Sequence, residues 1–141
     1  MKTPCLVIDD HQLFNDGLAL LLKESGKFDV LEQVTDSRMT YSKCLEKRPE
    51  LVIVDYNMPF LDGLSLVKQL RTLVHRSKIV VISMYADRRE IEVFKAFEIE
   101  GYLSKTSPSA EILMSLDKIM KGESVFQVKQ EQKTSFEKDF F

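Results

Sequence analysis

Short apolar runs recur along the chain, each rich in β-branched residues and bounded by polar ones. Three of them, residues 5–8, 51–54 and 79–82, are continuously apolar, as expected of strands covered on both faces of a parallel sheet. A fourth run, residues 28–34, contains polar members, and a fifth, residues 102–103, is very short. These two runs are predicted to lie at the edges of the sheet.

The segments between these runs show the periodicity of α-helices. Apolar side chains spaced three and four residues apart form four stripes, which include Phe14 and Leu18, Leu66 and Leu70, Ile91 and Phe94, and Ile112 and Leu116. A weaker helix is predicted over residues 36–47, where Arg48-Pro49 ends it. Strands and helices therefore alternate along the chain.

Residue types that are favoured at helix ends occur at the ends of the predicted helices. Asp62 and Ser107 are the predicted N-caps of the third and fifth helices, with Pro108 at the first position of the fifth. Gly26 and Gly122 follow the first and last helices, where glycine readily takes the left-handed conformation that ends a helix. The alternation is thus five strands with five helices.

This alternation predicts an α/β fold in which a parallel sheet lies between two layers of helices. Placing the polar and the short strand outermost gives the strand order 2-1-3-4-5, a flavodoxin-like (βα)5 three-layer sandwich. The pattern covers residues 1–122. Residues 123–141 keep no period and are interpreted as a linker or C-terminal tail, and the abrupt end at Phe141 suggests a longer natural chain.

Composition narrows the classes of function. The 141 residues suit one domain, and a formal net charge of -2 provides no broad positive field, so we expect no direct binding of DNA by this segment. No apolar run approaches the ~20 residues of a membrane span, and no membrane association is expected. Cys5 and Cys44 lie among apolar residues as inert thiols. A reducing cytoplasm is the simplest location.

Polar groups stand where the predicted strands end. Asp9 and Asp10 follow the first strand, Asp55 ends the third, Ser83 ends the fourth and Lys105 follows the fifth. In this fold the carboxyl ends of these strands line one crevice. Three carboxylates, a hydroxyl and an ammonium are therefore predicted to meet there.

Three carboxylates so close together repel one another, and a divalent cation would keep them ionised at neutral pH. Oxygen ligands with room for water suit Mg²⁺, or Mn²⁺ in its place. Asp10 and Asp55 are the predicted ligands, with Asp9 acting partly through water. The backbone carbonyl of Asn57 could supply a further oxygen.

A carboxylate can also attack phosphorus and form an acyl phosphate, and Asp55 is the best placed to do so. The transferred phosphoryl group spreads its charge over three equatorial oxygens. The cation, Lys105 and the Ser83 hydroxyl would each neutralise one of them. The predicted chemistry is directed at the chain itself, so we do not expect an enzyme that turns over a separate substrate.

The order and spacing of these groups over residues 3–122 closely resemble the receiver domain of bacterial two-component response regulators. The motifs that carry the resemblance are Ile8-Asp9-Asp10, Val54-Asp55-Tyr56-Asn57-Met58-Pro59 with Asp62-Gly63, Val81-Ile82-Ser83, and Gly101-Tyr102-Leu103-Ser104-Lys105. Each motif is common by itself, but the whole set in this order is highly specific.

The resemblance implies that a sensor histidine kinase donates a phosphoryl group to Asp55. It also implies that Tyr102 is a switch that turns inward as Ser83 moves toward the phosphoryl group, and that the fourth helix, fifth strand and fifth helix carry the signal. Thr106 follows Lys105 where most receivers have proline, which resembles the LuxR/NarL/FixJ-type branch. A helix-turn-helix output domain, absent from these residues, would then bind DNA and control transcription, and phosphorylation could produce a homodimer.

A second departure from the family pattern lies next to the predicted site. Met84 stands where the family usually has a small residue, and its bulk could narrow the entrance to Asp55. We therefore expect slow phosphorylation by small donors such as acetyl phosphate, and slow loss of the label. His11 and His75 are not placed to form a metal pair, and His11 is expected at the start of the first helix.

Two other functions would use similar residues. An aspartate-dependent phosphatase usually has its nucleophile and acid two residues apart after the first strand, but His11 occupies the second of those places. A constitutive flavodoxin-like scaffold would not need all five polar groups. Taken singly, Asp9-Asp10 could cap a helix, Asp55 could be an ordinary turn residue, and Tyr102 could be a lid on the core.

Overall fold

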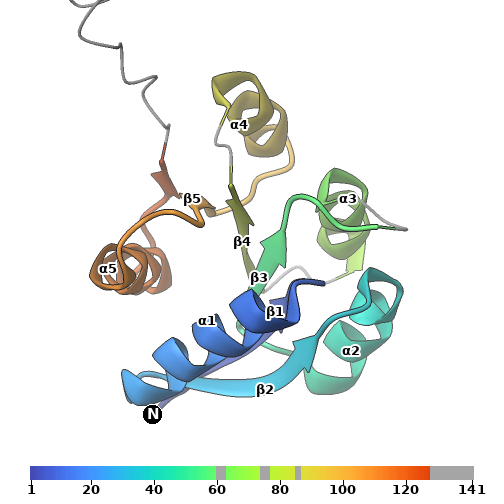
Figure 1. The fold of residues 1–141 in the computed structure, drawn as a ribbon. Helices are drawn as coiled ribbons and strands as arrows, with labels where there is room; N and C mark the ends of the chain where they lie inside the picture. Colours follow the sequence, from blue (N-terminus) through green and yellow to red (C-terminus); the bar gives the residue numbers. More distant parts are fainter. Residues whose placement is uncertain (60–62, 74–76, 85–86, 128–141) are drawn as a thin grey trace, which may run out of the picture.

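The computed structural model describes residues 1–59, 63–73, 77–84 and 87–127. Its centre is a parallel sheet with the strand order β2-β1-β3-β4-β5-β6 (Figure 1). The strands are β1 (Thr3–Ile8), β2 (Phe28–Val34), β3 (Leu51–Asp55), β4 (Lys78–Ser83), β5 (Gly101–Ser104) and β6 (Val125–Phe126). The predicted flavodoxin-like order 2-1-3-4-5 is confirmed, and one further strand is added.

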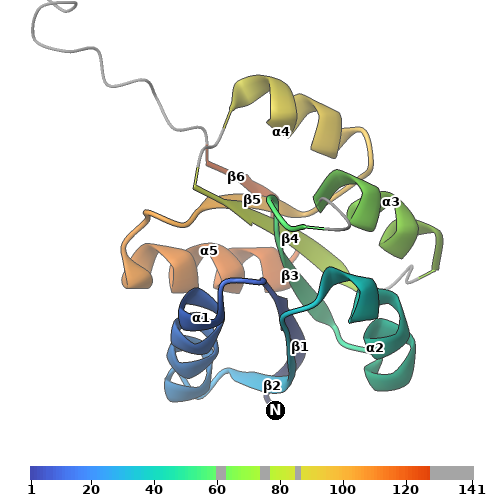
Figure 2. The same ribbon diagram turned by 45° about the vertical axis from the view of Figure 1, so that its right-hand side comes forward.

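Within the described residues, five α-helices cover the two faces of the sheet. They are α1 (Gln12–Glu24), α2 (Thr40–Lys47), α3 (Gly63–Leu73), α4 (Arg88–Lys95) and α5 (Ser109–Met120), and a short 3-10 turn, η1 (Ser37–Met39), precedes α2. Helices α1 and α5 lie on one face, while α2, α3 and α4 lie on the other (Figure 2). None of the helices within the described ranges is long and apolar enough to cross a bilayer.

Successive side chains of the buried strands point to opposite faces of the sheet and pack in two separate hydrophobic cores. Leu6, Ile8 and Val54 point toward α3 and α4, whereas Val7 and Ile53 point toward α1 and α5. Successive strand side chains face opposite sides of a sheet, so a continuously apolar strand can serve both cores. This burial fixes the register of β1 and β3 and therefore the positions at which both strands end.

The sixth strand changes the predicted edge of the sheet. Tyr102 of β5 pairs with Phe126 of β6, so β5 is an inner strand rather than an outer one. The backbone N–H of Gln127 donates to the carbonyl of Tyr102 at 2.8 Å, and Phe126 packs against the core. Residues 125–127, which lie in the predicted linker or tail, thus extend the sheet, whereas residues 128–141 lie outside the described ranges.

The helix ends agree with the sequence in part. Gly26 and Gly122 have φ of 74° and 102°, as predicted for residues that end helices. The Ser107 cap was wrong: Pro108 is the N-cap of α5, and the Ser107 hydroxyl donates to Gln127 Oε1 at 2.9 Å instead. Asp62 lies outside the described residues.

Candidate functional site

A buried amide holds the loop at which β1 ends. The Asn15 side chain, fully buried in α1, lies with Nδ2 at 3.3 Å from the carbonyl of Val7, 3.1 Å from that of Asp9 and 3.2 Å from that of Val34. These acceptors come from β1, the loop after it and β2. Asn15 therefore fixes the backbone that carries Asp9 and Asp10. Sequence reasoning missed this residue, although a polar side chain beside the apolar stripe of the first helix was a usable signal.

Lys105 bridges two of the predicted carboxylates. Its Nζ lies 2.7 Å from Asp9 Oδ2 and 3.3 Å from Asp55 Oδ1, and its side chain is 5% exposed. The ring of Phe14 lies 4.4 Å from the same ammonium and covers it. The backbone N–H of Asn57 donates to Asp55 Oδ1 at 3.3 Å. Residues from α1, β3 and the end of β5 thus meet around one charge.

The charges at the site oppose the ionisation of Asp55. Burial, and after it the charge of Asp9, raise the pKa of its carboxyl to about 6, although Lys105 and the backbone N–H of Asn57 act to lower it. One ammonium faces three carboxylates, so the site has a surplus of negative charge in the part of the chain that the structure describes. A further positive group would restore the ordinary ionisation of Asp55.

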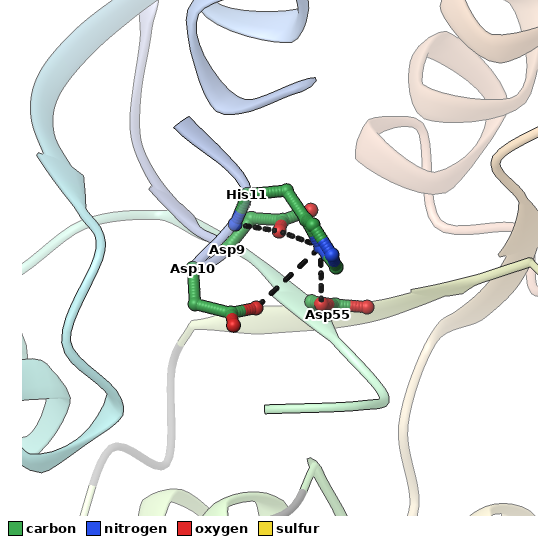
Figure 3. Close-up of side chains that lie close together, drawn as sticks. All are labelled: Asp9, Asp10, His11 and Asp55. Atoms are coloured by element: carbon green, nitrogen blue, oxygen red, sulfur yellow. Dashed lines mark hydrogen bonds and ion pairs between the residues drawn. The ribbon is translucent and has the colours of Figure 1, made fainter. Parts of the chain in front are cut away.

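The arrangement of oxygen atoms fits a divalent cation. Asp10 Oδ1 and Asp55 Oδ2 are buried and have no hydrogen-bond partner among the described residues. One ligand atom each from Asp9, Asp10, His11 and Asp55 can be chosen so that all lie within 4.8 Å of one another (Figure 3). Buried oxygens without a donor are costly unless a cation or water satisfies them. The residues present therefore fit the predicted Mg²⁺ or Mn²⁺.

Ser83 and Tyr102 form the side of the site nearest α4. Ser83 at the end of β4 is 1% exposed, and Tyr102 is fully buried. The Tyr102 hydroxyl donates to Glu90 Oε2 at 3.1 Å and shares a hydrogen bond with the Ser83 side chain. Burial raises the pKa of Tyr102. Glu90, in the first turn of α4, carried no signal in the sequence that would have linked it to Tyr102.

The predicted site residues are largely gathered at the carboxyl edge of the sheet. The Asn57 side chain is exposed, and the contact that its backbone makes with Asp55 comes from the N–H, so the ligand role of its carbonyl stays a prediction. Met84 follows Ser83 and is 46% exposed, and its effect on access also stays a prediction. His11 is the N-cap of α1, as expected, but its side chain also enters the acidic cluster.

Comparisons with known proteins agree with this geometry. The sequence profile of the family described as "Response regulator receiver domain" matches residues 5–117. Response regulator protein VraR of Staphylococcus saprophyticus is 26% identical over 129 residues, which cover 90% of this chain and 61% of that protein. The chain thus spans about three fifths of the length of that relative.

Solved structures show the same fold. The signal receiver domain of NarL from Mycobacterium tuberculosis aligns with a TM-score of 0.81 and 25% identity, covering 86% of this chain and 98% of that one. The isolated REC domain of RcsB from Salmonella enterica serovar Typhimurium, in the presence of phosphomimetic BeF3⁻, aligns with a TM-score of 0.83 and 20% identity, covering 90% and 94%. The likeness to RcsB is one of fold.

Proposed function

We propose a phosphorylation switch centred on Asp55, on the premise that this chain belongs to the response regulator receiver family. Its homologues are regulators of the LuxR/NarL type, and family membership implies phosphorylation-dependent signalling. The finer function that we infer is that Asp55 accepts a phosphoryl group from a sensor histidine kinase. The observation that carries this inference is the Lys105 ammonium between the buried carboxylates of Asp9 and Asp55.

The two oxygens of Asp55 have different neighbours, which supports a division of roles. Oδ2 faces the acidic cluster, whereas Oδ1 lies beside Lys105 and the N–H of Asn57. In the proposed transfer, Oδ1 attacks the phosphorus of a phosphohistidine, an O–P bond forms and the N–P bond breaks. The bonding electron pair leaves with the imidazole of the kinase. Lys105 and the Ser83 hydroxyl then hold phosphoryl oxygens, because transfer depends on positioning and charge neutralisation.

A divalent cation is part of the proposal because the site has unsatisfied buried oxygens. Mg²⁺ or Mn²⁺ would be held by Asp10 and Asp55, with Asp9 and the Asn57 carbonyl as further oxygen sources, and would neutralise the charge of the carboxylates and of the phosphoryl group. Asn15 contributes by holding the loop that presents two of these carboxylates.

The switch would use the hydrogen bonds of Tyr102. Ser83 bonds to the Tyr102 hydroxyl, which in turn donates to Glu90 of α4. If Ser83 moves toward a phosphoryl group on Asp55, this chain of bonds must rearrange, and α4 is the element at its far end. A local charge change would thus alter the surface formed by α4, β5 and α5.

The wider setting of the switch is also inferred. VraR is longer than this chain, so we propose that an adjoining helix-turn-helix domain binds DNA and that phosphorylation acts on it, with homodimerisation as one route. A cytoplasmic location is consistent with the two thiols: Cys5 and Cys44 are unpaired and lie in cores on opposite faces of the sheet. Burial raises the pKa of both thiols to about 12.

Intact-mass measurement tests the proposed chemistry. The protein is incubated with acetyl phosphate and Mg²⁺, alongside Asp55→Asn and the matched control Asp29→Asn, which changes an exposed aspartate of β2. We expect one phosphoryl adduct in the parent and in Asp29→Asn, and none in Asp55→Asn. Hydrolysis of added phosphate esters would favour the phosphatase instead, and absence of any adduct would favour the scaffold.

A further inference from the structure

His11 is the residue at the site that the proposed switch leaves without a role. Its Nδ1 lies 3.3 Å from Asp9 Oδ1, 3.6 Å from Asp10 Oδ1 and 3.8 Å from Asp55 Oδ2. Figure 3 shows the three carboxylates converging on this one nitrogen. The imidazole is therefore directed into the cluster, although the side chain is 66% exposed.

The positions of these atoms are close to those of ligands around one ion. Ligands about 2.1 Å from an octahedral cation lie about 3.0 Å apart when adjacent and about 4.2 Å apart when opposite. The three distances from His11 Nδ1, 3.3, 3.6 and 3.8 Å, fall within that range. Two of the facing oxygens, Asp10 Oδ1 and Asp55 Oδ2, are those without a hydrogen-bond partner among the described residues. The Asp55 side chain is 4% exposed, so its unpartnered oxygen is a buried group aimed at this point.

Helix capping gives no reason for a histidine at this position. His11 is the N-cap of α1, where Ser, Thr, Asp or Asn would bond the first turn of the helix, and its side chain makes no such bond. The backbone N–H of His11 already donates to Asp9 Oδ1 at 2.8 Å, which a residue of another type could do equally well. What distinguishes His11 is the imidazole nitrogen that faces the carboxylates.

We propose that His11 Nδ1 is a direct ligand of the divalent cation, completing a mixed nitrogen and carboxylate site with Asp10 and Asp55. The inference rests on the proposed function in so far as both use the same two carboxylates. It goes further in assigning the preferred class of ion. Imidazole suits first-row transition ions such as Fe²⁺, Ni²⁺ and Zn²⁺, whereas Mg²⁺ selects oxygen ligands. The nitrogen therefore favours ions of that row over Mg²⁺, with Mn²⁺ the most weakly favoured of them.

Spectroscopy of bound Mn²⁺ tests this assignment without any phosphorylation step. The protein is loaded with one equivalent of Mn²⁺, and pulsed electron paramagnetic resonance is used to detect ¹⁴N coupling from a coordinated imidazole. We expect the coupling in the parent and in His75→Gln, which removes the other histidine of the chain. We expect it to be lost in His11→Ser, because serine is a good N-cap and has no side-chain nitrogen.

Affinity provides a second readout. Titrations should show that His11→Ser binds Mn²⁺ roughly tenfold or more weakly than the parent, with a smaller change for Mg²⁺, since loss of a ligand costs at least as much as loss of its supporting groups. Circular dichroism in EDTA checks that the variant is folded. If it is not, the His75→Gln protein still decides the question, because His11 is then its only possible imidazole.

Three results would overturn the assignment: Mn²⁺ bound without ¹⁴N coupling in the parent, coupling that disappears in His75→Gln, or equal losses of Mg²⁺ and Mn²⁺ affinity in His11→Ser. Each is separate from failure of the proposed function. That failure would appear as absence of an Asp55-dependent adduct, whichever atoms hold the metal.

Discussion

Each end of the sheet holds a cluster of charged side chains, partly buried at the amino end and largely buried at the carboxyl end, and the two clusters differ in how completely their members are paired. At the amino ends of β4 and β5, the Arg71 guanidinium donates to three main-chain carbonyls and to both oxygens of Glu100. Glu100 Oε2 also accepts from the backbone N–H of Ile79 at 2.6 Å. This cluster contains one positive and one negative charge, and each of the two side chains has several hydrogen-bond partners.

At the carboxyl ends, three carboxylates cluster and Lys105 pairs with those of Asp9 and Asp55, while Asp10 Oδ1 and Asp55 Oδ2 have no hydrogen-bond donor among the described residues. A cluster whose charges and hydrogen bonds are complete has no unpaired group, and it destabilises the fold only when one partner is removed. One that is incomplete destabilises the fold until a ligand or a covalent change supplies what is missing. The contrast separates a structural cluster from a functional one, and variants at each end can test it.

The largest effect is expected when the ammonium at the functional end is removed. Lys105→Gln should lower the initial rate of labelling by acetyl phosphate by about 10²–10³-fold, the usual cost of losing one charge-stabilising donor. Intact mass over time measures the rate. Arg71→Lys, at the structural end, should be labelled at the parental rate. Parental labelling of Lys105→Gln would contradict the role of Lys105.

Arg71→Ala should lower the stability of the protein, in contrast to Lys105→Gln, which should lower the rate of labelling. It leaves Glu100 and three carbonyls without their donor, so we expect the free energy of unfolding to fall by about 2–4 kcal/mol. Urea denaturation measures the loss. The control is Arg38→Ala, which removes a solvent-screened ion pair with Asp36 and should lower the free energy of unfolding far less. Equal losses in the two variants would remove the distinction between a buried and a surface pair.

Asp55→Asn should stabilise the metal-free protein. The pKa of Asp55 is raised from 3.8 to about 6, so the folded state holds its proton more tightly than the unfolded state does. The contribution of this group to stability is therefore present below pH 3.8 and is lost as pH rises to about 6. At pH 7.5 the variant should be more stable than the parent by about 1–3 kcal/mol.

The stability difference between Asp55→Asn and the parent should shrink as the pH is lowered toward 4. Saturating Mg²⁺ at pH 7.5 should also reduce this difference, because it stabilises the parent more than the variant. Thermal melts with and without EDTA measure both effects. The exposed control Asp29→Asn should show neither. A parent that is more stable than Asp55→Asn without metal would mean that the carboxylate is already satisfied.

The smallest expected effect concerns access to the site. Met84→Ala should raise both the rate of labelling by acetyl phosphate and the rate of loss of the label, since a half-exposed side chain beside Ser83 is shortened. Intact-mass time courses measure the two rates. Val93→Ala, an exposed apolar residue of α4, serves as the control. Unchanged rates in Met84→Ala would reject the narrowing of the entrance.

Local sequence patterns were sufficient for most of the architecture. Continuously apolar strands such as residues 51–54 must be covered on both faces, and the alternation with helical stripes then leaves few topologies. Asp9, Asp55 and Lys105 could be placed at one edge because strand ends coincide in a parallel sheet. The short strand β6 was missed, since the two residues Val125 and Phe126 have no periodicity of their own and become a strand by pairing with β5.

Patterns along the chain were enough to predict the fold class, the order of the first five strands and the set of polar groups at the carboxyl edge, because these follow from burial and from where strands end. The folded chain was needed to show that His11 turns toward the carboxylates, that Asn15 holds their loop and that Glu90 bonds Tyr102. Those contacts depend on side-chain direction across different elements, and spacing along one chain does not encode that direction.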